Sequence, residues 1–216
     1  MTPKEASERT REVAALAPII PVLTVDDPDT ADELAEALIA GGLPALEVTL
    51  RTPAALECIR RMAQVPGGVV GVGTLMSPAD VRAAKAAGAR FGVSPGATDA
   101  ILAAAEAEGL PMLPGSATAT EAMRLLERGY DFMKFFPAGT SGGAPALRAL
   151  SAPLAAIKFC PTGGVSLSNA PDYLSLPNVL CAGGSWVAPA DKVKARDWAG
   201  IEALAREAAA LERSAK

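Results

Sequence analysis

Residues 45–63, ALEVTLRTPAALECIRRMA, contain one complete strand-and-helix unit. The apolar and β-branched run at 45–50 is typical of a buried strand. Thr52 followed by Pro53 predicts a helix start, because threonine caps helix N-termini and proline is tolerated in the first helical turn. The Ala-rich stretch at 53–63 has helical periodicity. The unit therefore predicts a strand followed, after a short loop, by a helix.

The same order of strand and helix recurs along the chain. Seven further strand-like runs begin near residues 19, 68, 91, 111, 132, 157 and 179, and Ala-rich helical segments lie between them. Eight strands that alternate with helices predict an α/β fold with a parallel sheet covered by helices, and the count of eight favours a closed (β/α)8 TIM barrel. An open, doubly wound sheet is the alternative architecture.

The two ends of the chain add helices to this repeat. Residues 4–15 precede the first strand and predict an extra N-terminal helix that closes the bottom of the barrel, and residues 198–211 predict the last helix. No linker or low-complexity segment interrupts residues 1–216. We therefore expect one (β/α)8 barrel domain over the whole chain.

Composition narrows the class of partner. The chain is half hydrophobic, has a formal net charge of -4 and lacks a cluster of Lys or Arg, which argues against a nucleic-acid or membrane-surface partner. We expect neither a signal peptide nor a membrane span. Cys58, Cys160 and Cys181 are widely spaced and odd in number, which predicts a reducing, cytoplasmic location. A small-molecule partner remains.

The chain contains no histidine. This excludes Ser-His-Asp and Cys-His catalysis and the usual zinc sites, and the scattered cysteines offer no alternative metal cage. We therefore expect no metal and no cofactor. Acid-base chemistry must fall to Glu, Asp, Lys, Tyr or water.

Lys134 is the only charged residue in the strand-like run 132–138, FMKFFPA. Burial disfavours the charged form of a lysine, and a neutral amine can attack a carbonyl. Lys134 is therefore a candidate nucleophile, although a lysine at a strand end can also extend its head to water. Its main rival, Lys158, lies at the beginning of its strand, near the non-catalytic end of such a barrel.

Strand alternation brings a carboxylate into the same interior. In the run 45–51, Leu46 and Val48 share the face that should meet the helices, whereas Glu47 and Arg51 share the opposite, inward face. Arg51 lies at or beyond the C-terminal end of the strand, where active sites of this architecture lie. An internal Glu47–Arg51 ion pair with no catalytic role is the alternative.

Strand ends supply candidate binding groups. Gly163-Gly164 and Gly183-Gly184, the latter followed by Ser185, end the seventh and eighth strands, where backbone N–H groups often bind phosphate. Plain turns would also use these glycines.

Thr74 ends the third strand. Its hydroxyl could hold a carboxylate oxygen beside Arg51 or could cap a backbone group.

Taken together, the motifs resemble those of 2-keto-3-deoxy-6-phosphogluconate (KDPG) aldolases over nearly the whole chain. The most specific stretches are LEVTLRT at 46–52, KFFPA at 134–138 and FCPTGG at 159–164. Weaker matches are GG at 41–42, GVGT at 71–74, VSPG at 93–96 and GGSW at 183–186. Residues 114–118, after the fifth strand, depart from the family's usual sequence, and this difference concerns only one edge of the expected substrate pocket.

The resemblance implies a metal-free, class I aldolase on a (β/α)8 barrel, usually a homotrimer, in the Entner–Doudoroff route. Lys134 matches the Schiff-base lysine and Glu47 the general acid and base. The remaining matches are Arg51 and Thr74 for the keto-acid end, Gly163, Gly164 and Ser185 for the phosphate, and Pro95 and Thr162 for the pocket wall.

The expected reaction is reversible cleavage of KDPG, a phosphorylated keto acid, to pyruvate and glyceraldehyde 3-phosphate. The same chemistry on 2-keto-3-deoxy-6-phosphogalactonate or on 4-hydroxy-2-oxoglutarate (KHG) is the close alternative. An isomerase or lyase that uses Glu47 as base and Lys134 only as a charge is a second possibility. A non-catalytic phosphosugar-binding barrel is a third.

Overall fold

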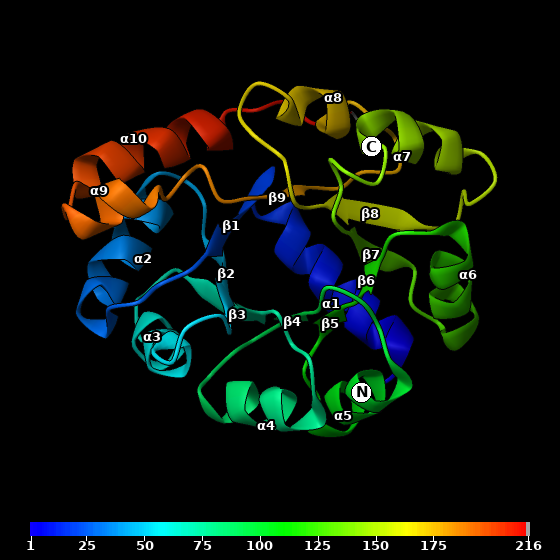
Figure 1. The fold of residues 1–216 in the computed structure, drawn as a ribbon, viewed down its shortest axis with the longest axis horizontal. Helices are drawn as coiled ribbons and strands as arrows, with labels where there is room; N and C mark the ends of the chain where they lie inside the picture. Colours follow the sequence, from blue (N-terminus) through cyan, green and yellow to red (C-terminus); the bar gives the residue numbers. More distant parts are fainter. Residues whose placement is uncertain (215–216) are drawn as a thin grey trace.

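The computed structural model describes residues 1–214 and shows helices arranged around a curled, parallel β-sheet (Figure 1). The predicted domain extends to residue 216, so its last two residues lie outside the described part. The strands are β1 Ile19–Leu23, β2 Ala45–Thr49, β3 Val69–Gly73, β4 Gly92–Val93, β5 Met112–Leu113, β6 Gly115–Ser116, β7 Phe132–Phe135, β8 Lys158–Pro161 and β9 Ala182–Gly184. Each of the eight predicted strand-like runs contributes at least one of them.

The strands form a six-stranded sheet in the order β5-β4-β3-β2-β1-β9 and a three-stranded sheet in the order β6-β7-β8. Their pairings are parallel. Pro114, which has no N–H to donate, separates β5 from β6, which were predicted as a single run. At the other edges, isolated parallel bridges pair Phe159 with Val179 and Thr162 with Gly183.

Helices follow most of the strands. They are α1 Pro3–Ala15, α2 Ala31–Ala40, α3 Ala55–Met62, α4 Pro78–Ala86, α5 Asp99–Glu108, α6 Ala119–Arg128, α7 Gly143–Ser151, α8 Ala170–Leu174, α9 Ala190–Lys194 and α10 Trp198–Ala209, with a 3-10 turn, η1, at Pro28–Thr30. Among the described residues, no helix is long and apolar enough to span a bilayer.

Several helix boundaries obey local signals. Thr118 and Glu121 form a capping box at the start of α6, and Gly129 ends that helix in a left-handed conformation. The predicted N-cap at Thr52 is wrong. The Thr52 hydroxyl instead donates a hydrogen bond to the carbonyl of Val25 at 2.7 Å, and α3 begins only at Ala55.

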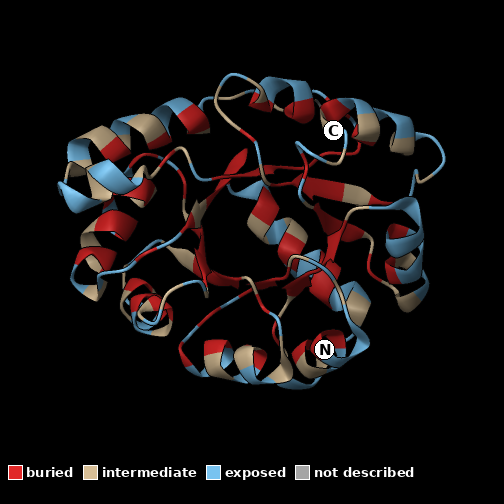
Figure 2. Cartoon of the chain, viewed as in Figure 1, coloured by how far each residue is buried: buried red, intermediate tan, exposed pale blue. Residues whose placement is uncertain are grey.

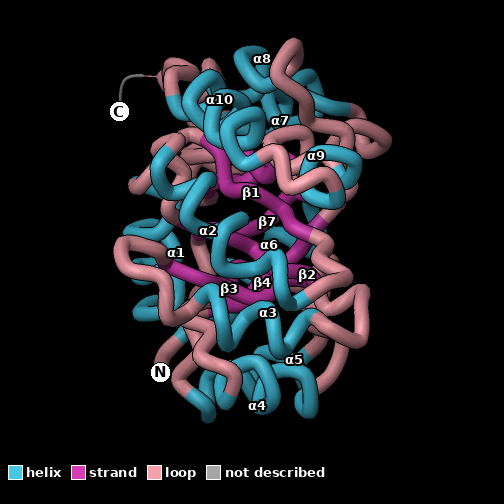
Figure 3. Tube along the Cα trace, turned by 90° about the vertical axis from the view of Figure 1, so that its left-hand side faces the viewer, coloured by secondary structure: helices cyan, strands magenta, loops and turns pink. Residues whose placement is uncertain are grey.

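The predicted extra helix is present as α1 and packs where β7 begins. The Arg11 guanidinium lies 2.9 Å from the Asp131 carboxylate and 5.8 Å from the centre of the Phe132 ring. The Ser7 hydroxyl accepts a hydrogen bond from the Asp131 N–H at 3.1 Å. Figure 1 shows α1 behind the ring of strands, and Figure 3 shows it on one side of them.

The core has two layers, as strand alternation predicts. Leu46 and Val48 of β2 lie in the larger cluster between strands and helices, whereas Ala45 lies in a smaller inner cluster. The buried members of the inner cluster are Ala14, Ile20, Ala45, Phe91, Val93, Leu113, Phe132, Cys160, Leu180 and Cys181. Figure 2 shows burial concentrated on the strands and on the helix faces turned toward them.

The three cysteines are all buried. Cys58 of α3 lies in the larger cluster between strands and helices and is fully shielded from solvent. This desolvation raises the pKa of its thiol to about 11. A thiol with a raised pKa is a poor nucleophile at neutral pH. Cys58 therefore behaves as a packing residue.

Candidate active site

Lys134 of β7 and Glu47 of β2 meet inside the curled sheet. Their side chains come from different sheets, yet Nζ lies 3.3 Å from Oε1, and the residues are only 5% and 3% exposed. The alternative of a lysine head in bulk water is therefore wrong. Charged groups with so little access to water are costly unless paired, so each residue accounts for the burial of the other.

The backbone of β7 fixes the position of Lys134. Lys134 faces Gly115 of β6 and Cys160 of β8 in register, and its N–H donates to the carbonyl of Pro114 at 2.9 Å. The ring of Phe136, two residues further on, has its centre 5.1 Å from Nζ. This aromatic face favours a cation at that place. The sequence pattern included Phe136 in the KFFPA motif at 134–138 but predicted no contact with Lys134 for it.

Glycine makes room for the Glu47 carboxylate. Glu47 pairs with Gly71 of β3, and a Cβ atom on Gly73 would collide with Oε1 of Glu47. A Cβ atom on Gly71 would likewise collide with the Phe91 ring of the inner cluster. The sequence pattern placed both glycines only in the weak GVGT match at 71–74 and gave them no role of their own. Their place inside an apolar run was the available signal, because glycine within a strand often marks a close approach.

Arg51 and Thr74 follow the C-terminal ends of the adjacent strands β2 and β3. Arg51 is exposed, and Glu47 pairs with Lys134 rather than with Arg51, so the alternative of a Glu47–Arg51 ion pair is wrong. Thr74 is half-buried and has φ 64°, a left-handed conformation that is uncommon for threonine. Such strain concentrates at functional sites.

Pro95 and Thr162 lie at the same end of the strands. Thr162 is buried, and its hydroxyl occupies the space that a Cβ atom on Gly183 would need. Pro95 follows β4, and its carbonyl lies where a Cβ atom on Gly115 would be. Glycine at 115 and 183 thus permits close packing beside the candidate site.

The predicted phosphate-binding residues lie in two neighbouring loops, which the bridge between Thr162 and Gly183 brings together. Gly163 and Gly164 have φ of 91° and 76°, and a Cβ atom on Gly163 would lie 3.2 Å from the Phe136 ring. Ser185 is exposed after β9. Within residues 1–214, the N–H groups of Gly164 and Ser185 have no hydrogen-bond partner. These donors are available to an anion.

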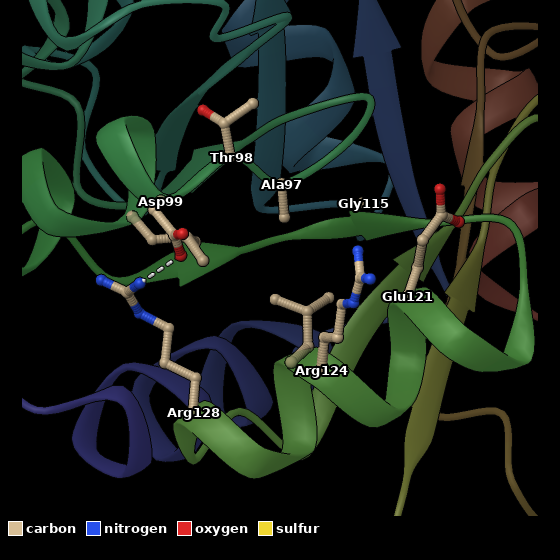
Figure 4. A pocket seen from close by; sticks show the side chains of 9 residues that line it. Ala97, Thr98, Asp99, Gly115, Glu121, Arg124 and Arg128 are labelled. Carbon is tan, nitrogen blue, oxygen red and sulfur yellow. Dashed lines mark hydrogen bonds and ion pairs between the residues drawn. The ribbon is translucent and has the colours of Figure 1, made fainter.

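A separate pocket of about 500 Å³ lies between α5 and α6 (Figure 4). Its polar rim includes an ion pair between Asp99 and Arg128 at 2.8 Å. Its lining residues are Ala97, Thr98, Asp99, Leu102, Gly115, Glu121, Arg124, Leu125 and Arg128. None of the predicted site residues lines this pocket. This pocket is therefore separate from the interior pair of Lys134 and Glu47.

The interior pair has the composition of a Schiff-base site. A primary amine shielded from water can attack a ketone, and a carboxylate within hydrogen-bond distance can carry the protons that this reaction moves. Comparison with known proteins points to the same chemistry. The family model for KDPG and KHG aldolases matches residues 10–204.

Relatives match over nearly their full length. A 2-dehydro-3-deoxy-phosphogluconate aldolase of Zymomonas mobilis is 49% identical over 203 residues, which are 94% of this chain and 96% of the relative. The crystal structure of the Z. mobilis KDPG aldolase with 3-phosphoglycerate is 48% identical, covers 96% of this chain and 98% of its own, and superposes with a TM-score of 0.92.

A second solved structure is a KDPG aldolase from Legionella pneumophila, with pyruvate captured at low pH as a covalent carbinolamine intermediate. It is 42% identical, covers 93% of this chain and 98% of its own, and has a TM-score of 0.90. The match of the family model, the identity of the relatives and the buried lysine–glutamate pair agree. The chain belongs to the KDPG and KHG aldolase family.

Proposed function

We propose that this chain is a class I aldolase that reversibly cleaves KDPG to pyruvate and glyceraldehyde 3-phosphate through a Schiff base on Lys134. The observation that carries the proposal is the buried contact of 3.3 Å between Lys134 and Glu47. A relative that holds pyruvate as a covalent carbinolamine supports it.

Schiff-base formation uses both members of the pair. Proton transfer from the ammonium of Lys134 to the carboxylate of Glu47 converts two buried charges into two neutral groups. The free amine attacks the C2 ketone of the substrate and forms a carbinolamine. Glu47 then donates a proton to the C2 hydroxyl, which leaves as water, and an iminium remains.

Carbon–carbon cleavage follows from the iminium. Glu47, directly or through a water molecule, takes the proton of the C4 hydroxyl while the electrons of the C3–C4 bond move into the iminium. Glyceraldehyde 3-phosphate leaves. Protonation of the resulting enamine at C3 and hydrolysis of the new iminium release pyruvate and restore Lys134.

The two charged ends of the substrate have separate partners. Arg51 and Thr74 bind the keto-acid carboxylate. They follow the C-terminal ends of the neighbouring strands β2 and β3, and substrates of this architecture bind at that end of the strands. The N–H groups of the two glycine-rich loops, with Ser185, bind the phosphate. Pro95 and Thr162 line the pocket between these ends. The structure of the relative with 3-phosphoglycerate supports a site for a phosphorylated acid.

The scaffold in this proposal is a closed (β/α)8 barrel over the whole chain as one domain. Two features support closure. Only Pro114 separates β5 from β6, and the bridge between Thr162 and Gly183 joins β8 to β9 at the other edges of the two sheets. The cytoplasmic location that the cysteines indicate fits an enzyme of sugar-acid breakdown and stays a prediction.

The homotrimer that the resemblance implies is also part of the proposal. Met76 is 64% exposed and Met123 49% exposed, and burial of such apolar surface between copies would be favourable. Light scattering of the purified protein should give the mass of three chains. The mass of one chain would contradict this assembly.

Replacing the nucleophile should abolish turnover. Lys134→Arg keeps a positive charge beside Glu47 but cannot form an imine, so KDPG cleavage should fall by about 10³-fold or more while the melting temperature changes little. Glu47→Gln should lower kcat by about 10²- to 10⁴-fold. A coupled assay of pyruvate release measures both variants.

Lys158→Arg is the matched control, because Lys158 lies at the start of β8 and donates to the carbonyl of Pro177 at 2.8 Å. It should keep full activity. Appreciable turnover by Lys134→Arg would refute the Schiff-base assignment.

The phosphate contact should separate the two substrates named in the family description. Ser185→Ala should raise KM for KDPG by about tenfold and leave KM for KHG, which has no phosphate, nearly unchanged. Ser175→Ala is the control, since the Ser175 hydroxyl donates only to the Asp172 carbonyl at 3.1 Å. Equal effects of Ser185→Ala on both substrates would place the phosphate elsewhere.

A further inference from the structure

A pair of threonine hydroxyls lies at the C-terminal ends of β1 and β2. Val22 of β1 pairs with Glu47 of β2, and Thr24 and Thr49 each lie two residues further along these strands. Because side chains alternate along a strand, Thr24 and Thr49 face the same interior as Glu47. Their Oγ1 atoms are 3.1 Å apart.

This hydroxyl pair lies at the level of the Glu47 carboxylate. Thr49 pairs with Gly73 of β3, and the carboxylate of Glu47 occupies the space beside that same glycine. Thr49 is fully buried, whereas Thr24 is exposed. Thr24 is therefore the solvent-exposed member of the pair, on the C-terminal side through which a substrate must reach Lys134.

The direction of the hydrogen bonds follows from the number of protons. The Thr49 hydroxyl donates its single proton to the carbonyl of Leu23 at 2.9 Å. Its contact with Thr24 must then be accepted by Thr49 and donated by Thr24. While Thr24 donates its proton to Thr49, its oxygen presents its lone pairs and accepts hydrogen bonds.

We propose that Thr24, oriented by Thr49, is a specificity-determining residue that accepts a hydrogen bond from the C5 hydroxyl of the six-carbon substrate. This inference rests on the proposed aldolase function. The C4 and C5 hydroxyls are the neutral donors of KDPG, and the C4 proton goes to Glu47. The C5 hydroxyl remains for an acceptor beside that carboxylate.

The same acceptor discriminates against KHG. In KHG the C5 position is a carboxylate, whose oxygens are also acceptors, so Thr24 has no proton to receive from it. Thr24 can donate to this carboxylate only by giving up its hydrogen bond to Thr49, and the loss of that bond disfavours KHG. Thr24 therefore raises the preference for KDPG over KHG.

The test is Thr24→Val, which keeps the shape of the side chain and removes the hydroxyl. Loss of one neutral hydrogen bond should raise KM for KDPG by roughly 3- to 10-fold with kcat little changed. KM for KHG should stay the same or fall. Thr24→Ser should restore the KM for KDPG, and Thr49→Val should reproduce the loss of preference.

One measurement separates this inference from the function on which it rests. Exchange of the C3 hydrogens of pyruvate in D2O needs Lys134 and Glu47 but no aldehyde, so it should proceed equally in wild type and Thr24→Val. Absence of exchange in wild type would overturn the aldolase assignment, and this inference with it.

Thr52→Val is the matched control, because the Thr52 hydroxyl donates to the Val25 carbonyl at 2.7 Å. It should lower the melting temperature without changing the ratio of KM values. Normal exchange together with an unchanged KM for KDPG in Thr24→Val, or with equal increases for KDPG and KHG, would overturn the role of Thr24 alone.

Discussion

The burial of one lysine beside one glutamate is the constraint on which the interior of this protein depends. Neither charge would be stable there alone, because the transfer of an isolated charge out of water costs several kcal/mol. Lys134 and Glu47 come from strands of different sheets and meet at 3.3 Å, so the curved arrangement of the two sheets around one interior is what brings them together. A flat sheet would hold them apart. The fold and the proposed chemistry thus require each other.

Glycines leave the space that the groups around this pair need. A Cβ atom on Gly71 would collide with the Phe91 ring, and one on Gly73 would collide with the Glu47 carboxylate. A Cβ atom on Gly183 would collide with the Thr162 hydroxyl. Below them, aromatic and aliphatic residues fill the inner cluster as far as Ala14 of α1. Above them, threonines and glycine-rich loops follow the strand ends. The interior therefore passes from apolar packing, through the charged pair, to groups suited to a polar ligand.

Local patterns predicted much of this arrangement, and the residues that they missed share a physical reason. Alternation along residues 45–51 correctly assigned Leu46 and Val48 to the outer core and Glu47 to the interior. Thr52 was misassigned because a tertiary partner, the Val25 carbonyl, replaces the local cap. Gly73 and Thr24 contact residues of the neighbouring strand β2. The register between two strands cannot be predicted from the sequence of either strand alone.

Trapping of the covalent intermediate tests the central claim most directly. The protein is incubated with pyruvate and borohydride, and the reduced product is mapped by mass spectrometry. We expect one pyruvyl adduct, on Lys134, with Lys158 unmodified and with no adduct in Lys134→Arg. A protein that acquires no adduct under conditions that label a known class I aldolase, or one modified at another lysine, would contradict the proposed role of the buried pair.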